Sequence, residues 1–445
     1  MKIIYNIADA RANLLVRTPL ELQEISPGLK LKVREAFGEE LTLQEVVGRI
    51  VAEVRASGDR ALFDYGKRID GVKLAALEVR PEEIARARSK VGSELLSALE
   101  LAAQRIKSFH MNCKRQSWVD FAEGGLGQWI RPLGTVGIYV PGGRASYPST
   151  VLMTAIPARV AGVSEIIVAT PPGQDGVSPA TLVAAELAGV DRVFKIGGAQ
   201  AIAALAFGTQ TVPRVDKICG PGNIFVQLAK RMVYGMVDID GFYGPTETII
   251  LADESANPAI CAADLLAQAE HDVLASAILI TTSAELATRV NQEVAKQLVE
   301  LDRQDIITAS LENRGGIIVV DDVERAAELI NDYAPEHLSL MVKDAWSCAE
   351  KMRNAGGIFI GEDSPEVVGD YVAGPSHVMP TGGTARFGSP LTVDDFLKVT
   401  SVIAIDGKAL RAIGPAAANI AKAEGLDAHA RAVNIRLTRR KRKRE

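Results

Sequence analysis

Four of the five histidines in this 445-residue chain stand close in sequence to a second polar side chain that could share their chemistry. The four pairs are Gln268 with His271, Glu336 with His337, Asp370 with His377, and Glu424 with His429. Histidine titrates nearest neutrality, and its neutral imidazole is a common metal ligand. The fifth histidine, His110, has no such companion and is expected to be a partly buried helix residue. The pattern favours one composite site.

Two of the pairs offer metal-ligand chemistry. Gln268 and His271 end a helical pattern that starts at Ala259, and a spacing of three would put both on one helix face. Such a pair on its own is more often a surface feature. Asp370 and His377 lie in a loop-like stretch after a predicted strand, and a carboxylate with an imidazole suits zinc.

The other two pairs suit different roles. Glu336 and His337 follow Pro335, and adjacent acid and imidazole groups can pass a proton stepwise. A capping or salt-bridging pair is the commoner outcome for a single Glu-His. His429 follows a predicted helix break at 425–427 and, taken alone, reads as a structural helix residue. Together, with only His110 left over, the four pairs favour a site.

The elements that position these residues are predicted strands. Each is a short β-branched run that ends in glycine or proline, and amphipathic segments separate the runs. They form two series: 135–140, 165–170, 192–196 and 215–219, then 247–251, 277–280, 316–320, 337–341 and 357–360. This pattern is typical of parallel sheets. It predicts an α/β fold of two doubly wound, Rossmann-like domains, with ligands beyond the carboxyl ends of the strands.

The predicted domain boundaries follow from these series. Residues 1–30 form an N-terminal helical arm, and 41–110 are helical in pattern. Residues 31–133 with 245–388 form a substrate and zinc domain, 134–244 a dinucleotide domain, and 389–445 a helical tail of a kind that often crosses to a second subunit.

Three glycine turns close strands of the first series, but none has the G-x-G-x-x-G fingerprint. They are Pro141-Gly-Gly, Gly197-Gly-Ala-Gln200 and Gly220-Pro-Gly-Asn223. The last opens a helix, whose free N–H groups could face a phosphate. Each turn could instead need glycine only for a positive φ. Three in succession make a nucleotide site plausible.

Composition narrows the class of protein. Hydrophobic residues make up 47% and charged residues 24%, as in ordinary globular proteins, and no stretch is long and apolar enough to span a bilayer. The four cysteines are scattered, and no signal peptide is evident, which indicates the cytoplasm. Six basic residues at 439–444 follow an acidic body, so nucleic-acid binding is not expected.

In these motifs the chain resembles the histidinol dehydrogenase family over nearly its whole length. The matching segments are Val-Gly-Ile-Tyr139-Val-Pro-Gly-Gly, Gly-Gly-Ala-Gln200, Val-Asp-Lys-Ile-Cys-Gly-Pro-Gly-Asn223, Asp264-Leu-Leu-Ala-Gln268-Ala-Glu-His271, Ala-Pro-Glu336-His337-Leu, Gly-Asp370-Tyr-Val-Ala-Gly-Pro-Ser-His377-Val and Leu-Asp-Ala-His429. The resemblance implies oxidation of L-histidinol to L-histidine with two NAD through the aldehyde, the last step of histidine biosynthesis. It also implies an intertwined homodimer whose C-terminal histidine reaches the partner's site.

The resemblance assigns roles residue by residue. Glu336 and His337 would be the acid–base pair, with Glu336 activating water in the second half-reaction. One zinc ion per subunit would anchor the substrate and be held by Gln268, His271, Asp370 and His429. The remaining substrate contacts would be Thr246, His337, His377 and Glu424, and NAD would contact Tyr139, Gln200 and Asn223.

Two departures from the family pattern leave an alternative open. Thr246 stands where a serine is usual, and Ser376 replaces the more usual asparagine before His377. A related zinc- and NAD-dependent dehydrogenase of another small polar alcohol, such as a sulfonated diol, would keep the same chemistry. A third reading, nucleic-acid binding through residues 439–444 on a retired scaffold, is disfavoured by the intact Glu336-His337 pair.

Overall fold

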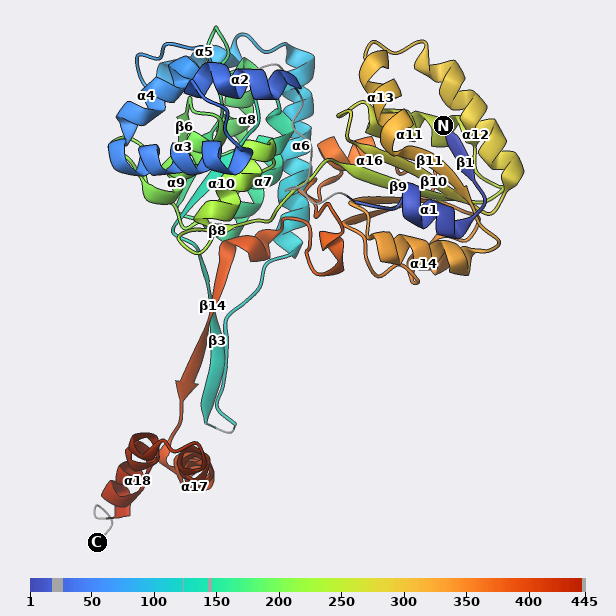
Figure 1. The fold of residues 1–445 in the computed structure, drawn as a ribbon. Helices are drawn as coiled ribbons and strands as arrows, with labels where there is room; N and C mark the ends of the chain where they lie inside the picture. Colours follow the sequence, from blue (N-terminus) through green and yellow to red (C-terminus); the bar gives the residue numbers. More distant parts are fainter. Residues whose placement is uncertain (18–26, 123, 143–145, 442–445) are drawn as a thin grey trace. The chain divides into compact units, whose positions relative to one another are not determined.

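The computed structural model describes residues 1–17, 27–122, 124–142 and 146–441 (Figure 1). The chain divides into two compact units. The first comprises Met1–Cys113 with Leu133–Phe396, and the second comprises Lys114–Pro132 with Leu397–Glu445. The predicted α/β fold with two parallel sheets and a helical C-terminal tail is confirmed.

The first parallel sheet has the strand order β6-β5-β4-β7-β8. Its strands are β4 (Thr135–Tyr139), β5 (Glu165–Ala169), β6 (Arg192–Phe194), β7 (Lys217–Cys219) and β8 (Asp238–Ile239). The connecting helices are α7 (Pro148–Ala161), α8 (Pro179–Ala188), α9 (Gly198–Phe207) and α10 (Ile224–Val233). Chain direction along the sheet reverses between β4 and β7, which is the topological switch point where α/β sheets bind ligands.

Helices from the N-terminal part cover this sheet (Figure 1). They are α2 (Pro27–Phe37), α3 (Leu43–Ser57), α4 (Asp59–Arg68), α5 (Pro81–Arg88) and α6 (Ser93–Asn112). The apolar stripe Leu43, Val46, Val47, Ile50 and Val54 of α3 is buried in one core with the alanine-rich helix α9. This core packs α3 and α4 against the first sheet, whereas the sequence prediction grouped residues 31–133 with the second sheet. The domain boundaries stay a prediction.

The second parallel sheet has the order β1-β11-β10-β9-β12-β13. Its strands are β1 (Lys2–Ile4), β9 (Glu247–Ala252), β10 (Ser276–Thr281), β11 (Gly315–Val319), β12 (His337–Met341) and β13 (Gly357–Ile360). Its helices are α1 (Ile7–Asn13), α11 (Pro258–Ala269), α12 (Ala284–Leu298), α13 (Gln304–Arg314), α14 (Val323–Tyr333), α15 (Ala345–Ala349) and α16 (Glu366–Val368). Separate apolar clusters fill the two faces, as a doubly wound sheet requires. The N-terminal arm therefore contributes an edge strand as well as a helix.

A π-helical turn (Gly369–Ala373) follows α16, and 3₁₀ turns occupy Thr384–Arg386 and Val393–Phe396. The second unit holds a three-stranded antiparallel sheet of β14 (Leu397–Ala404), β3 (Gly125–Pro132) and β2 (Trp118–Asp120). Helices α17 (Gly407–Ala423) and α18 (Asp427–Lys441) then pack on each other. The tail was expected to be wholly helical from residue 389, so β14 is an addition to it.

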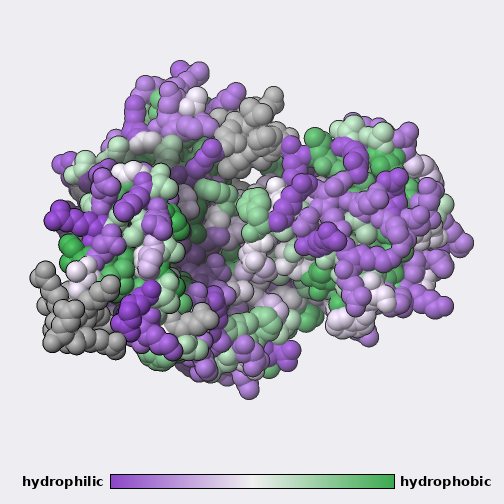
Figure 2. All heavy atoms as spheres, turned by 90° about the horizontal axis from the view of Figure 1, so that it is seen from below, coloured by the Kyte–Doolittle hydropathy of each residue, from purple (hydrophilic) through white to green (hydrophobic). Residues whose placement is uncertain are grey.

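The surface carries apolar side chains among polar ones, as the space-filling view shows in green and purple (Figure 2). Within the described ranges, no helix combines the length and the hydrophobicity that crossing a bilayer demands. The side chains of the whole basic run at 439–444 lie outside the described residues, since the side chains of 439–441 and all of 442–445 are not described.

Candidate active site

The acid–base candidates lie at the amino ends of two neighbouring parallel strands. Thr246 directly precedes β9 and Glu336 directly precedes β12, and these strands pair with each other. The Oγ1 atom of Thr246 therefore reaches Glu336 and donates a hydrogen bond of 2.6 Å to its Oε2. These residues thus lie at the opposite end of their strands from the one where ligands were expected, and the position of a ligand stays a prediction.

The carboxylate of Glu336 is buried and held in one orientation. Its Oε2 atom also accepts a hydrogen bond of 3.1 Å from the backbone N–H of Glu247. The segment enters the strand through Ala334, which ends α14 with a φ of 52°, a conformation that costs energy in a residue other than glycine. Burial raises the pKa of Glu336 to about 7, against the opposing effects of His337 and the two hydrogen bonds. A carboxyl group of this kind exchanges a proton near neutral pH.

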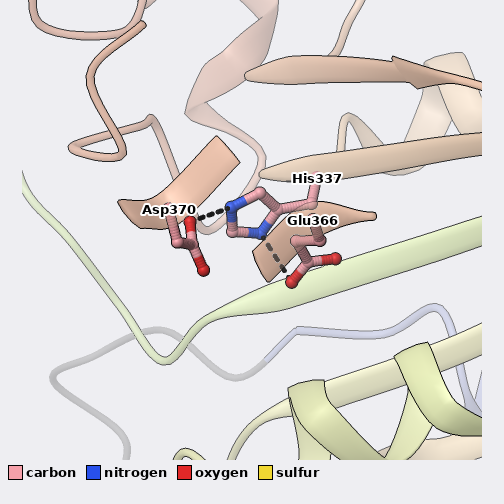
Figure 3. Close-up of side chains that lie close together, drawn as sticks. All are labelled: His337, Glu366 and Asp370. Atoms are coloured by element: carbon pink, nitrogen blue, oxygen red, sulfur yellow. Dashed lines mark ion pairs between the residues drawn. The ribbon is translucent and has the colours of Figure 1, made fainter. Parts of the chain in front are cut away.

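The imidazole of His337, also buried, lies between carboxylates on both ring nitrogens (Figure 3). Its Nδ1 atom is 3.4 Å from Oε1 of Glu366 and 3.8 Å from Oε2 of Glu336. Its Nε2 atom is 3.6 Å from Oδ1 of Asp370. Burial lowers the pKa of His337, but the charges of Glu366, Glu336 and Asp370 outweigh burial and raise it to about 10. The protonated ring is thus strongly stabilised.

Glu366 is a site residue that the sequence reasoning missed. It begins α16, is buried, and accepts a hydrogen bond from Thr248 of β9. Burial raises the pKa of Glu366 to about 7. The available signal was the spacing of four between Glu366 and Asp370, which brings two carboxylates to successive turns.

Asp370 belongs to the π-helical turn Gly369–Ala373, a geometry that is frequent at functional sites. Arg105 of α6 fixes this turn by donating to the carbonyl oxygens of Val372 and Ala373, at 3.0 and 3.3 Å. Burial tends to raise the pKa of Asp370, but the neighbouring His337 holds it below the ordinary value. The loop expected here is therefore a rigid turn.

His377 is oriented by the same turn. Its Nδ1 lies 2.8 Å from the backbone oxygen of Asp370, which can only accept, so Nδ1 carries the hydrogen. The Nε2 atom then accepts from the Thr150 hydroxyl, 3.4 Å away. Ser376, one of the two departures from the family pattern, is buried and donates to the carbonyl oxygen of Met153 at 3.0 Å. Its hydroxyl therefore makes a hydrogen bond inside the protein.

The side-chain amide of Gln268, a predicted metal ligand, is held through its nitrogen. Its Nε2 donates to Oγ1 of Thr246 at 3.2 Å and to the backbone oxygen of Ser276 at 3.3 Å. Its Oε1 atom is buried and has no hydrogen-bond partner among the described residues. A buried amide oxygen without a donor is costly unless a ligand engages it. Zinc accepts oxygen and nitrogen donors, so this atom fits such an ion.

His271 lies just beyond the helix that carries Gln268. Helix α11 ends at Ala269, and the backbone N–H of His271 bonds to the oxygen of Gln268 at 3.3 Å. Glu270 keeps a right-handed helical conformation, and this i to i+3 hydrogen bond continues the last turn, so the expectation that both side chains share one face stays a prediction. The charges of Asp370 and His337 nevertheless act on the pKa of His271, which burial lowers. His271 thus lies near the same cluster.

A second set of possible metal donors is His337, Glu366 and Asp370, whose ligand atoms all lie within 4.8 Å of one another. Glu366 and Asp370 face opposite nitrogens of the His337 ring, however (Figure 3). This arrangement suits an imidazole positioned for proton transfer better than a ring bound to an ion. Asp370 belongs to this set and also to the predicted zinc ligands, with Gln268, His271 and His429.

Glu424 and His429 lie in the second unit. Glu424 caps the C-terminal end of α17, and His429 lies in the first turn of α18, after Gly425 with a φ of 74°. Both side chains are exposed. The predicted helix break is present, and the role of both residues in the site stays a prediction.

The candidate dinucleotide residues lie at the carboxyl edge of the first sheet. Tyr139 ends β4, and its hydroxyl accepts a hydrogen bond of 3.1 Å from the N–H of Gly198. Gln200, two residues further, donates to Asp70 at 3.3 Å. Asn223 caps α10 by accepting from the N–H groups of Phe225 and Val226, so only its amide NH₂ remains for a ligand.

Asp70, which the sequence reasoning did not single out, completes this edge. Burial raises its pKa to about 6. A cavity of about 640 Å³ opens along the same edge beyond β4 and β5 and is lined in part by Gly142, Ser146, Thr170 and Arg86. The edge thus offers room and polar groups for an elongated ligand.

His110, the histidine without a companion, is fully buried on α6. Its ring meets Phe109 edge-on, with centroids 5.1 Å apart. Neither ring nitrogen has a hydrogen-bond partner among the described residues.

Comparison with known proteins agrees with this geometry. The family model described as histidinol dehydrogenase matches residues 34–437. A histidinol dehydrogenase of Dehalococcoides mccartyi strain CBDB1 is 55% identical over 397 residues, which cover 88% of this chain and 91% of that protein. One from Deinococcus radiodurans is 51% identical over 434 residues, covering 97% and 98%. A crystal structure of histidinol dehydrogenase from Elizabethkingia anophelis superposes with a TM-score of 0.90 at 36% identity, covering 98% of this chain and 97% of that one.

Proposed function

Since the chain belongs to the histidinol dehydrogenase family and is an NAD-dependent oxidoreductase, we propose that it oxidises L-histidinol to L-histidine with two NAD, as the last step of histidine biosynthesis. The observation that carries the proposal is the buried pair Glu336 and His337, held among Thr246, Glu366 and Asp370. Two proton-transfer groups side by side suit two successive oxidations at one carbon.

In the first half-reaction, the neutral form of His337 accepts the hydroxyl proton of histidinol while a hydride leaves the same carbon for NAD, giving the aldehyde and NADH. Because the pKa of His337 is raised to about 10, the ring must first release its proton, and the neutral form becomes more abundant as the pH rises. The carboxylates on both sides of the ring stabilise the imidazolium that forms. In the second half-reaction, Glu336 takes a proton from the water that adds to the aldehyde. A second hydride then leaves the hydrated carbon for another NAD, giving the carboxylate.

The substrate contacts follow from the same residues. Gln268, His271, Asp370 and His429 would hold one zinc ion, which when bound would anchor the imidazole and amine of the substrate. The Oε1 atom of Gln268, which is buried without a hydrogen-bond partner among the described residues, supports this set of zinc ligands. His377, fixed by the Asp370 carbonyl, would contact the substrate. Glu424 would pair with its amino group.

NAD would lie along the carboxyl edge of the first sheet. Tyr139, at the end of β4, and Asn223, after β7, flank the switch point where such sheets bind nucleotides. Gln200 lies in the first turn of the helix after β6, whose first residue, Gly198, donates to the Tyr139 hydroxyl. These three positions support a dinucleotide site without the usual glycine fingerprint.

We further propose a homodimer in which the second unit of each chain completes the site of its partner. This unit exposes many large apolar side chains, which soluble proteins normally cover at an interface. They include Phe121, Trp118, Trp129, Ile403, Ile413 and Ile420. Such a dimer would bring His429 and Glu424 to the zinc and substrate positions.

A turnover assay tests the function. Purified zinc-loaded protein should form two NADH per histidinol, and EDTA should abolish turnover. Absence of NADH from histidinol would refute the proposal. Faster turnover of dihydroxypropanesulfonate would instead favour the related diol dehydrogenase. That alternative is weakened by Thr246 and Ser376, because both hydroxyls already bond within the protein.

A further inference from the structure

A fully buried ion pair stands directly behind the glycine turn that closes β7. Lys230 of α10 and Asp240, which follows β8, both have side chains without solvent exposure. Lys230 Nζ donates to Oδ1 of Asp240 and, at 2.9 Å, to the backbone oxygen of Gly220. The other oxygen of Asp240 accepts from the backbone N–H of Gly220 at 2.6 Å. The pair therefore holds both polar groups of this one peptide residue.

The turn it holds is packed tightly against the candidate dinucleotide residues. Gly220 has a φ of 112°, and a Cβ atom there would lie 2.0 Å from the backbone oxygen of Tyr139. Gln227 supports the next part of the turn by donating to the oxygen of Gly222 at 3.2 Å. Asn223, the last residue of the turn, is exposed at the edge. Displacing Gly220 would thus displace both Tyr139 and Asn223.

A buried ion pair is an expensive way to stabilise a fold. Removing two charges from water costs about as much as their attraction returns, so apolar residues of similar size often stabilise equally well. The Lys230 ammonium also lies over the ring of Tyr243, whose centroid is 5.0 Å away. What the pair provides, and apolar side chains would not, is a fixed position for the Gly220 peptide.

We propose that Lys230 and Asp240 are positioning residues for NAD: they fix the Gly220–Asn223 turn in the geometry that binds the dinucleotide. The inference rests on the proposed NAD site and adds to it two residues that do not themselves touch the ligand. It predicts that replacing this pair weakens NAD binding, whereas replacing an ion pair away from the turn does not.

The experiment compares two double variants of the zinc-loaded enzyme. Lys230→Met with Asp240→Leu removes both buried charges. Arg192→Met with Glu78→Gln removes a partly exposed bidentate pair at the start of β6, whose N–O distances are 2.7 and 2.8 Å, and serves as a control away from the turn. We expect the first variant to bind NADH about tenfold more weakly, as loss of a charged hydrogen bond implies, and to melt below the wild type, because the N–H and C=O of the buried Gly220 lose their partners. Its KM for NAD should rise while kcat and the KM for histidinol stay near wild type. The control should lose stability without losing NADH affinity.

Three results decide the matter, with NADH affinity measured by fluorescence titration. A lower melting temperature with unchanged NADH affinity would overturn the inference, since the pair would then be only structural. Asn223→Ala separates the inference from its premise: if this variant also binds NADH normally, the proposed NAD site itself is wrong. If Asn223→Ala weakens NADH binding and the double variant does not, only the positioning role fails. If the double variant does not fold, Asp240→Asn takes its place, because asparagine keeps the shape without the charge. This variant must also bind NADH more weakly than the wild type, by a smaller factor.

Discussion

The Oε1 atom of Glu366 lies 3.4 Å from Nδ1 of His337, while its other oxygen accepts a hydrogen bond from Thr248 in the neighbouring strand. This carboxylate therefore ties the imidazole to the sheet on the side opposite Asp370. The contact distinguishes two arrangements of the site. In one, Glu366 positions the proton-transfer ring; in the other, it is itself a metal ligand.

Glu366→Gln should separate these arrangements because glutamine has the same shape without the charge. We expect kcat to fall by about 10- to 100-fold, as for loss of an orienting partner, while bound zinc stays near one per subunit. Asp370→Asn should lose both activity and zinc. Zinc is counted by atomic absorption on dialysed protein. A zinc-free Glu366→Gln protein would mean that His337, Glu366 and Asp370 hold the ion.

Glu336→Gln should abolish the second oxidation more severely than the first. Glutamine keeps the shape but cannot take a proton from water, so hydrate oxidation should slow by about 10²- to 10⁴-fold. Because the pKa of Glu336 is raised to about 7, the ionised base is present above that pH and lost below it. The wild-type rate with histidinaldehyde should therefore fall as pH drops through about 7. If the Glu336→Gln enzyme shows the same fall in rate below pH 7, a group other than Glu336 causes that fall.

Most strands of the two parallel sheets could be predicted because each is a short apolar run that ends in a turn. The edge strands β1 and β8, of three and two residues, were not predicted because they are too short to leave a pattern. Strand β14 could not be predicted either, since most of its side chains are exposed and it pairs with β3, more than 260 residues earlier in the chain. A strand with no buried face leaves no periodic pattern in the sequence.

The site residues were predictable where type and spacing carried chemistry, as for Glu336 with His337. Glu366 was missed because nothing near it in sequence is a histidine; the pairing of β9 with β12 brings it there. The predicted helix ran to His271, whereas α11 ends two residues earlier, at Ala269, and one i to i+3 hydrogen bond continues its last turn to His271. Helix ends depend on local hydrogen bonds that periodicity does not report.

Gln268→Leu tests the zinc assignment through the oxygen that lacks a donor. Leucine fills a similar volume but offers no ligand, so zinc affinity should fall by at least about tenfold. A competition titration with a chromogenic chelator measures that affinity. The exposed Gln304, on α13, provides a control: Gln304→Leu should bind zinc as the wild type does. Equal affinities in the two variants would remove Gln268 from the ligand set.

His110 should make the fold acid-sensitive. Burial lowers its pKa to about 4 from an ordinary 6.5, so between these values the unfolded chain binds a proton that the folded chain does not. Stability is then fully present above pH 6.5 and falls towards pH 4, by on the order of 3 kcal/mol from this group. In His110→Phe this component should vanish, whereas the exposed neighbour variant Met111→Leu should retain it. Urea unfolding at several pH values gives the slopes, and identical slopes for all three proteins would exclude His110 as the source.

Mixing two inactive variants tests whether subunits share their sites. Glu336→Gln disables the first unit and His429→Asn disables the second, so each homodimer should be inactive. If the second unit completes the partner's site, a mixed dimer joins one intact Glu336 with one intact His429. Random re-association makes half of the dimers mixed, each with one intact site, and should restore roughly a quarter of wild-type activity. If both residues act within one chain, every site in the mixture lacks one of them, and mixing restores nothing. Co-expression with two different affinity tags, followed by tandem purification, isolates the mixed dimer and should double the restored fraction.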